Sequence, residues 1–231
     1  MANGVTRTTA NNRLHDVNAL VLRYVPQGPL DIMDVGVSSG ITTAEWSESL
    51  TSAGVPHHIL AGDICHEARR RSCGRFATVV LEPKRDRVVY AEILGRGFSP
   101  ALPSFRTRLA SPVVGALVRV PGRTRHVSLS SDRLKALPTI TTVEDDVFQH
   151  VPTYDARFHI VRAANLLNRV YFSDDALRAA LTNLQRRLRP GGLLVVCRTT
   201  DDGTNHATIF RDQAVVDRLG EGSEIEHLVS R

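Results

Sequence analysis

The stretch LDIMDVGVSSG, residues 30–40, is followed directly by ITTAEWSESLTSAG. Its apolar first half, around Asp34, predicts a buried parallel strand, and the small residues after it predict a tight turn into a helix that begins near Thr42. Gly36 and Gly40 allow backbone conformations that other residues resist. The first N–H groups of a helix lack intrahelical acceptors and can face an anionic or polar ligand. A strand, a glycine-rich turn and a helix N-terminus together predict a nucleotide site.

Two other known motifs compete for this turn. A dinucleotide-binding dehydrogenase requires G-x-G-x-x-G, but Ser38 stands where the second glycine should be, which disfavours an NAD site. Residues 36–40, GVSSG, also match the G-x-S-x-G turn of α/β-hydrolases, which makes Ser38 a candidate nucleophile. That hydrolase turn follows several strands and an oxyanion loop, whereas only about 30 residues precede this one. An esterase that uses Ser38 therefore stays as an alternative.

The pattern D-x-G-x-x-x-G, formed by Asp34, Gly36 and Gly40, resembles the first motif of class I S-adenosylmethionine (SAM)-dependent methyltransferases. A second predicted strand, His57–Gly62, ends in Asp63, at the place where such folds hold the two ribose hydroxyls of SAM. The alternative is that this acid only caps a helix. The resemblance implies these cofactor-binding residues: Asp34, Gly36, Ser38, Gly40 and Asp63.

The same resemblance returns later in the chain. A fourth strand is predicted at Phe158–Val161, and after a helix the run LRPGG, residues 188–192, leads into the apolar LLVV, as in class I methyltransferases. Pro190 lacks an N–H and Gly191 tolerates a positive φ, so we expect them to end that helix. Arg162 is expected at the carboxyl end of the fourth strand, beside the cofactor.

A third strand is predicted at Thr139–Val143 and leads into the acidic run EDD. In the family that the sequence resembles, an acid here and the next backbone N–H hold the adenine of SAM. The resemblance assigns these two roles to Asp146 and Val147. A solvated acidic loop is the alternative.

A basic segment separates the second and third predicted strands. It holds fifteen Lys/Arg and five Asp/Glu between His66 and Lys135, a net charge of +10, whereas the whole chain has +5. Residues 76–94 predict a β-hairpin with its turn at 83–86, and a basic amphipathic helical stretch follows. We expect residues 66–135 to meet an anionic acceptor or the surface of a membrane; arginines that are merely solvated are the alternative.

The cysteines and the N-terminal sequence bear on compartment and metal binding. Cys65, Cys73 and Cys197 form no C-x-x-C pair and are odd in number, so neither a disulfide framework nor a zinc site is expected, and no metal site at all. The polar N-terminus and the absence of 18 consecutive apolar residues predict neither export nor a spanning helix. We expect a cytoplasmic protein, peripheral at the membrane if the basic segment binds lipid.

The fold predicted from these elements is α/β: a doubly wound, mostly parallel, seven-stranded Rossmann-like sheet of order 3-2-1-4-5-7-6. We expect one domain over residues 1–231, with a subdomain of a β-hairpin and a basic helical segment inserted at 66–138. Residues 206–211 and 214–220 predict the last two strands, and the helix that normally separates strands five and six is missing.

The resemblance implies transfer of a methyl group from SAM to an oxygen or nitrogen of an acceptor that the sequence does not identify. A domain that binds SAM or a nucleotide without catalysis is a further alternative. His206 is the candidate general base, because it follows Asp201 and Asp202, and nearby carboxylates would raise its pKa. A simple turn at Asp201-Asp202-Gly203 is the competing interpretation.

Overall fold

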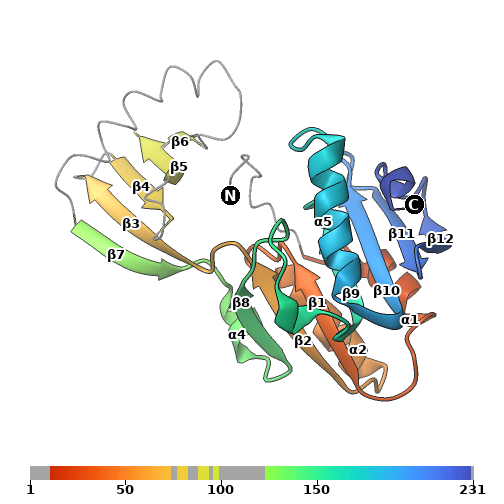
Figure 1. Ribbon diagram of the computed structural model, residues 1–231. Helices are drawn as coiled ribbons and strands as arrows, with labels where there is room; N and C mark the ends of the chain where they lie inside the picture. Colours follow the sequence, from red (N-terminus) through yellow and green to blue (C-terminus); the bar gives the residue numbers. More distant parts are fainter. Residues whose placement is uncertain (1–10, 74–76, 83–87, 94–95, 99–122, 230–231) are drawn as a thin grey trace. The chain divides into compact units, whose positions relative to one another are not determined.

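Figure 1 shows a computed structural model of the chain. It divides into two compact units, which we name the core unit (residues 9–64 and 131–231) and the insert unit (residues 1–8 and 65–130). The structure describes residues 11–73, 77–82, 88–93, 96–98 and 123–229.

The core unit is built on a seven-stranded sheet of order β12-β11-β10-β9-β1-β2-β8. Its first five strands in chain order run parallel to one another. The sixth, β11, runs antiparallel to both of its neighbours, β10 and β12. The central strands are almost wholly buried, as expected for a parallel sheet that is covered on both faces. The strands are β1 (Leu30–Val35), β2 (His57–Asp63), β8 (Ile140–Glu144), β9 (Phe158–Ala164), β10 (Leu188–Thr199), β11 (Asn205–Arg211) and β12 (Ala214–Leu219).

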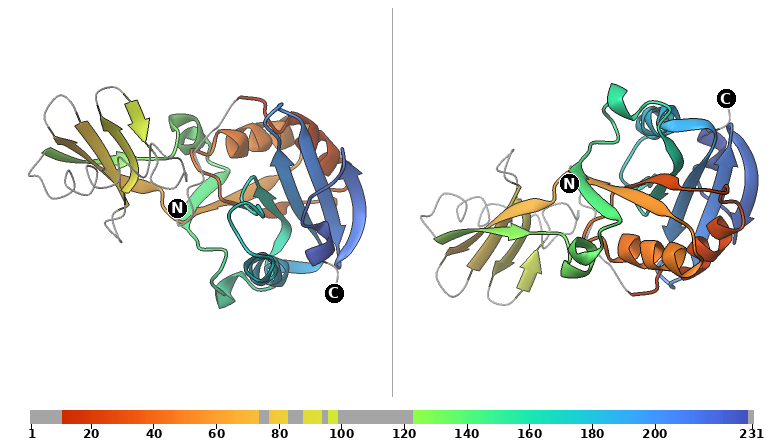
Figure 2. Two further views of the ribbon diagram at one scale, coloured as in Figure 1. Left: turned by 90° about the horizontal axis from the view of Figure 1, so that it is seen from above. Right: turned by 90° about the horizontal axis from the view of Figure 1, so that it is seen from below.

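Helices cover both faces of this sheet (Figures 1 and 2). Helices α1 and α2 pack on one face, where the buried cluster includes Trp46, and α5 packs on the other. Trp46 has no exposed surface and belongs to the core. The helices of the core unit are α1 (His15–Leu22), α2 (Ile41–Ser52), α4 (Asp132–Ala136), η1 (Pro152–Tyr154), α5 (Asp174–Arg186) and η2 (Glu226–Leu228).

The order of the last two strands differs from the prediction. In chain order the sheet is 3-2-1-4-5-6-7, because β11 pairs with β10 and β12 takes the edge. Thr200 N donates to Thr204 O and Gly203 N to Thr200 O, which closes a tight turn between β10 and β11. A connection this short can only join antiparallel neighbours, whereas reaching the far edge would need a crossover of a dozen or more residues.

Two predicted boundaries were wrong. Helix α5 ends at Arg186, and Pro190 and Gly191 lie inside β10, where the pairing with β9 shifts between Leu188 and Leu193. They therefore form a bulge and do not end the helix. Strand β9 continues to Ala164, beyond the predicted end at residue 161, so Arg162 lies within the strand.

The insert unit is a five-stranded antiparallel sheet of order β6-β5-β4-β3-β7. The predicted hairpin corresponds to β4 and β5, while β3 and β7 were not predicted as strands. A basic helical stretch was expected after the hairpin, but Arg123, Arg125 and His126 lie in the strand β7; residues 99–122 lie outside the described residues. The strands are β3 (Glu67–Cys73), β4 (Ala77–Leu81), β5 (Val88–Ile93), β6 (Arg96–Phe98) and β7 (Arg123–Ser128).

In the described part of the chain, no helix combines the length and the apolar character that crossing a membrane requires.

Candidate cofactor site

The predicted strand, turn and helix are confirmed as β1, residues 36–40 and α2. Gly36 N donates to Gly62 O over 2.8 Å, and Gly40 N donates to Val37 O over 2.8 Å. Gly36, Ser38 and Gly40 have φ values of 71°, 58° and 76°, which residues with a Cβ rarely adopt. The turn lies at the carboxyl edge of the parallel strands, where open α/β sheets bind their ligands.

The structure joins this turn to the acid at the end of β2. Ser38 N donates a hydrogen bond of 2.7 Å to Oδ2 of Asp63, whose side chain is buried. The Ser38 hydroxyl is also buried, and it forms no hydrogen bond with any described residue. An unsatisfied buried hydroxyl costs about 1–3 kcal/mol. A polar ligand on this turn would satisfy the hydroxyl, so these residues fit the cofactor that the sequence motif implies.

Asp34 and Arg162 lie beneath the turn as a buried ion pair. Arg162 Nε and Nη2 donate to the Asp34 carboxylate over 3.0 and 2.6 Å, and Nη1 donates to Asn18 Oδ1 over 2.8 Å. Thr43 Oγ1 donates to the same carboxylate over 2.7 Å, and the guanidinium lies 4.0 Å from the centroid of the Trp46 ring. Arg162 has no exposed surface. The expectation that Arg162 contacts the cofactor is therefore not supported. Asp34 and Arg162 instead support the glycine turn from within the core.

A second buried ion pair lies in the loop that was expected to bind adenine. Arg187 donates to both oxygens of Asp145, over 2.6 and 3.0 Å, with both side chains nearly inaccessible. Asp145 N donates to Asp63 O over 2.9 Å, which brings this loop to the end of β2. Asp146 is half-buried and accepts a hydrogen bond of 3.0 Å from Phe148 N, and Val147 is buried. Both oxygens of Asp145 therefore accept hydrogen bonds from Arg187. Of the two aspartates, Asp146 is the one that remains for a ligand at the carboxyl edge of the sheet.

No protein-family model matches the sequence, and no curated protein matches it. Similar solved structures are the CMeT domain of the citrinin polyketide synthase (16% identity, TM-score 0.45, 81% of this chain) and NodS, an N-methyltransferase from Bradyrhizobium japonicum WM9 (14%, 0.41, 85%). A third is CalS10, an amino pentose methyltransferase from Micromonospora echinaspora (14%, 0.42, 88%). The chain spans 35%, 67% and 64% of the lengths of these three chains.

The glycine turn after the first strand is hydrogen-bonded to Asp63 at the end of the second. Both belong to a sheet whose first five strands have the order 3-2-1-4-5. The chain resembles the class I SAM-dependent methyltransferases. It departs from the sheet order that we expected for this methyltransferase fold in strands six and seven.

His206 lies at the start of β11, and its ring already accepts a hydrogen bond. Glu221 N donates to His206 Nδ1 over 3.0 Å, so the neutral ring carries its proton on Nε2 and offers no free lone pair. Asp202 instead accepts from the Thr200 hydroxyl and from Thr204 N, and the Thr200 hydrogen bond lowers the pKa of Asp202 to about 2. Asp202 therefore stabilises the turn, and the geometry does not support His206 as the general base.

Two leucines that the sequence did not single out contact the glycine turn. A Cβ on Gly36 would lie 3.0 Å from both methyl groups of Leu166, and a Cβ on Gly40 would collide with the side chain of Leu134. Leu166 lies in the loop after β9, and Leu134 lies in α4. Glycine is thus required at both positions by contact as well as by its positive φ.

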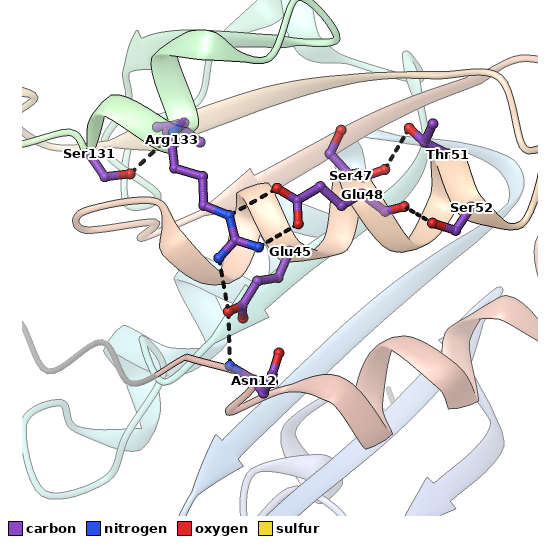
Figure 3. A network of polar contacts seen from close by, with 9 residues as sticks. Asn12, Glu45, Ser47, Glu48, Thr51, Ser52, Ser131 and Arg133 are labelled. Carbon is purple, nitrogen blue, oxygen red and sulfur yellow. Dashed lines mark hydrogen bonds and ion pairs between the residues drawn. The ribbon is translucent and has the colours of Figure 1, made fainter.

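A polar network holds α4 against α2 (Figure 3). Arg133 Nε donates to Glu48 Oε1 over 2.9 Å, and Arg133 Nη1 donates to Glu45 Oε1 over 3.4 Å. The same Glu45 oxygen also accepts a hydrogen bond from Asn12 N. The Arg133 hydrogen bond lowers the pKa of Glu48. This network fixes the short helix that places Leu134 on the turn.

Among the described residues, no three His, Cys, Asp or Glu side chains are grouped in a way that could hold a metal ion.

Proposed function

We propose that the chain is a SAM-dependent methyltransferase whose cofactor binds over residues 36–40, beside Asp63. The hydrogen bond from Ser38 N to Asp63 carries this proposal, because it joins a buried carboxylate at the end of β2 to the positive-φ turn that holds the unsatisfied Ser38 hydroxyl. Bound SAM would supply an electrophilic methyl group. Asp63 would accept hydrogen bonds from its ribose hydroxyls, and Asp146 with Val147 N would meet its adenine.

The acceptor in this proposal is an oxygen or nitrogen of a molecule that the basic insert unit helps to select. Methyl transfer from a sulfonium is an in-line displacement, so much of the rate can come from positioning the acceptor. We assign no general base among the described residues at the carboxyl edge of the sheet, because His206 Nδ1 already accepts a hydrogen bond from Glu221 N.

An esterase that uses Ser38 is disfavoured by the same geometry. A serine nucleophile needs a base within hydrogen-bonding reach, and Ser38 Oγ has no partner among the described residues. A cofactor-binding domain without catalysis would share the pocket. Isothermal titration with SAM, followed by mass spectrometry of a cell extract incubated with the protein and labelled SAM, separates these possibilities: binding with transfer supports the proposal, and the absence of SAM binding contradicts it.

Asp63→Ala is expected to weaken SAM binding by roughly 1.5–3 kcal/mol, the cost of losing hydrogen bonds to a charged group. Asp63→Asn retains an acceptor for Ser38 N, so it separates a loss of ribose contacts from a distorted turn. Isothermal titration calorimetry with SAM measures both affinities.

The matched control for this change is Asp31→Ala, which removes an exposed acid from the neighbouring strand β1 near its amino end. We expect that variant to bind SAM as the unmodified protein does. Unchanged affinity in a folded Asp63→Ala protein would refute the ribose assignment.

A further inference from the structure

Three exposed arginines share one face of the insert sheet. In the antiparallel pair of β3 and β7, Arg70 lies directly opposite Arg125, and Arg123 lies opposite Ser72. Since side chains alternate between the two faces of a strand, these three arginines project from the same face. Directly opposed Cβ atoms in such a pair are about 4.5–5.5 Å apart, and Arg123 follows roughly 7 Å along the strand.

No residue in the described part of the chain neutralises these three arginines. All three are exposed, and among the described residues none has an ion pair or hydrogen bond to an acidic side chain. In the core unit, by contrast, the exposed Arg169 and Arg218 form ion pairs with Asp174 and Glu226. Like charges placed directly opposite each other destabilise a sheet, so Arg70 and Arg125 raise the free energy of the unliganded fold. An anion between them would remove this repulsion.

The net charge of the insert unit's sequence favours an extended polyanion as its partner. Residues 65–130 contain thirteen Lys/Arg and four Asp/Glu, a net charge of +9. Such a field attracts a partner that carries many charges more strongly than a single carboxylate. Guanidinium groups match phosphate oxygens bidentately, and hydroxyls such as those of Ser72 and Thr78 can add hydrogen bonds to phosphates.

The described surface fits a nucleic acid better than a membrane. Surfaces that bind membranes peripherally insert apolar side chains below the headgroups, in addition to their basic residues. Among the side chains that the structure describes, the large exposed apolar ones are Phe148 and Val170, and both belong to the core unit. A phosphate backbone, in contrast, can be bound by charge and hydrogen bonds alone.

We propose that Arg70, Arg123 and Arg125 form a binding surface for the phosphate backbone of a nucleic-acid strand. Contacts to phosphates position a strand without specifying its sequence, so binding at this surface is independent of sequence. The inference goes beyond methyl transfer, and it is tested without SAM, so it can fail while the proposed function holds.

The test measures binding of a fluorescein-labelled single strand of about 20 nucleotides, as RNA and as DNA, by fluorescence anisotropy over a salt series. The unmodified protein is compared with the triple variant Arg70→Gln/Arg123→Gln/Arg125→Gln, which keeps a polar side chain at each position and removes three charges. Each phosphate contact contributes about 0.7 to the slope of log K against log salt for single strands, so the variant should flatten this slope by about 2.

The matched control is Arg169→Gln/Arg178→Gln/Arg218→Gln, which removes three exposed arginines from the core unit. We expect it to keep the slope of the unmodified protein. The insert variant should unfold at the same temperature as the unmodified protein or higher, because it relieves the repulsion between Arg70 and Arg125. If it unfolds earlier, the single variant Arg125→Gln replaces it and should flatten the slope by about 0.7.

Three outcomes would overturn the proposal. They are the absence of binding to either strand at low salt, an equal flattening by the insert and control variants, and binding to vesicles of phosphatidylcholine and phosphatidylserine but not to the strands. Flattening confined to the insert variant supports it.

Discussion

Replacing Arg162 by methionine is expected to lower the free energy of unfolding by about 3–5 kcal/mol, the cost of breaking a buried ion pair from one side. The change leaves the Asp34 carboxylate buried with the Thr43 hydroxyl as its remaining side-chain partner, and it leaves Asn18 Oδ1 without its donor. Urea unfolding followed by circular dichroism measures the difference.

Two further variants make this test specific. In Asp34→Leu/Arg162→Met both charges are gone, and we expect most of the stability to return, because well-packed apolar replacements of a buried pair are often neutral. Arg218→Met removes an arginine that pairs with Glu226 at the surface, and its cost should stay below about 1 kcal/mol. A loss for Arg162→Met as small as that of Arg218→Met would show that the buried pair does not stabilise the fold.

Gly36→Val is expected to abolish measurable binding of SAM. The φ of Gly36 is 71°, which costs a residue with a Cβ roughly 1–2 kcal/mol, and the added side chain would press on Leu166 on the turn that is proposed to receive the cofactor. Isothermal titration with SAM and a thermal melt of the same sample separate loss of binding from loss of the fold.

Gly54→Val is the matched control for the backbone strain alone. Gly54 has a φ of 70°, but a Cβ there would meet no atom within 4 Å, and the residue follows the far end of α2. This variant should lose stability and still bind SAM. Normal SAM binding by Gly36→Val would mean that the turn is not the cofactor site.

The local part of the site could be predicted from the sequence, because it depends on neighbours along the chain. The apolar run around Asp34 and the small residues after it specify the strand, the turn and the start of the helix. The meeting of Ser38 with Asp63 followed from the rule that adjacent parallel strands end at the same edge.

The role of Arg162 could not be read from local pattern, because its partner Asp34 lies on another strand, 128 residues away in the chain. A signal was nevertheless present. In LDIMDV the second of two acids, Asp34, lies among apolar residues, and in FHIVRAA Arg162 does the same; opposite charges inside two such central strands predict a buried pair. The same argument applies less directly to Asp145 and Arg187, since neither lies inside an apolar strand.

The other errors had a different cause. Strand β3 carries arginines on both faces, and β7 has arginines on one face with Thr124 and His126 on the other, so both lack the alternation of apolar and polar residues that marks a strand. The predicted order of the last strands was wrong because the connection between β10 and β11 is short. Residues 200–204 are too few to carry the chain across a sheet.

The two ends of the insert unit are paired with each other. Leu129 N donates to His66 O over 2.9 Å, and the His66 ring contacts the Ser130 hydroxyl at 3.1 Å. A module whose ends meet can be excised or grafted between β2 and α4 without rethreading the parent sheet. The core unit is proposed to bind the cofactor, and the insert unit to recognise a partner. Evolution can therefore exchange either unit independently of the other.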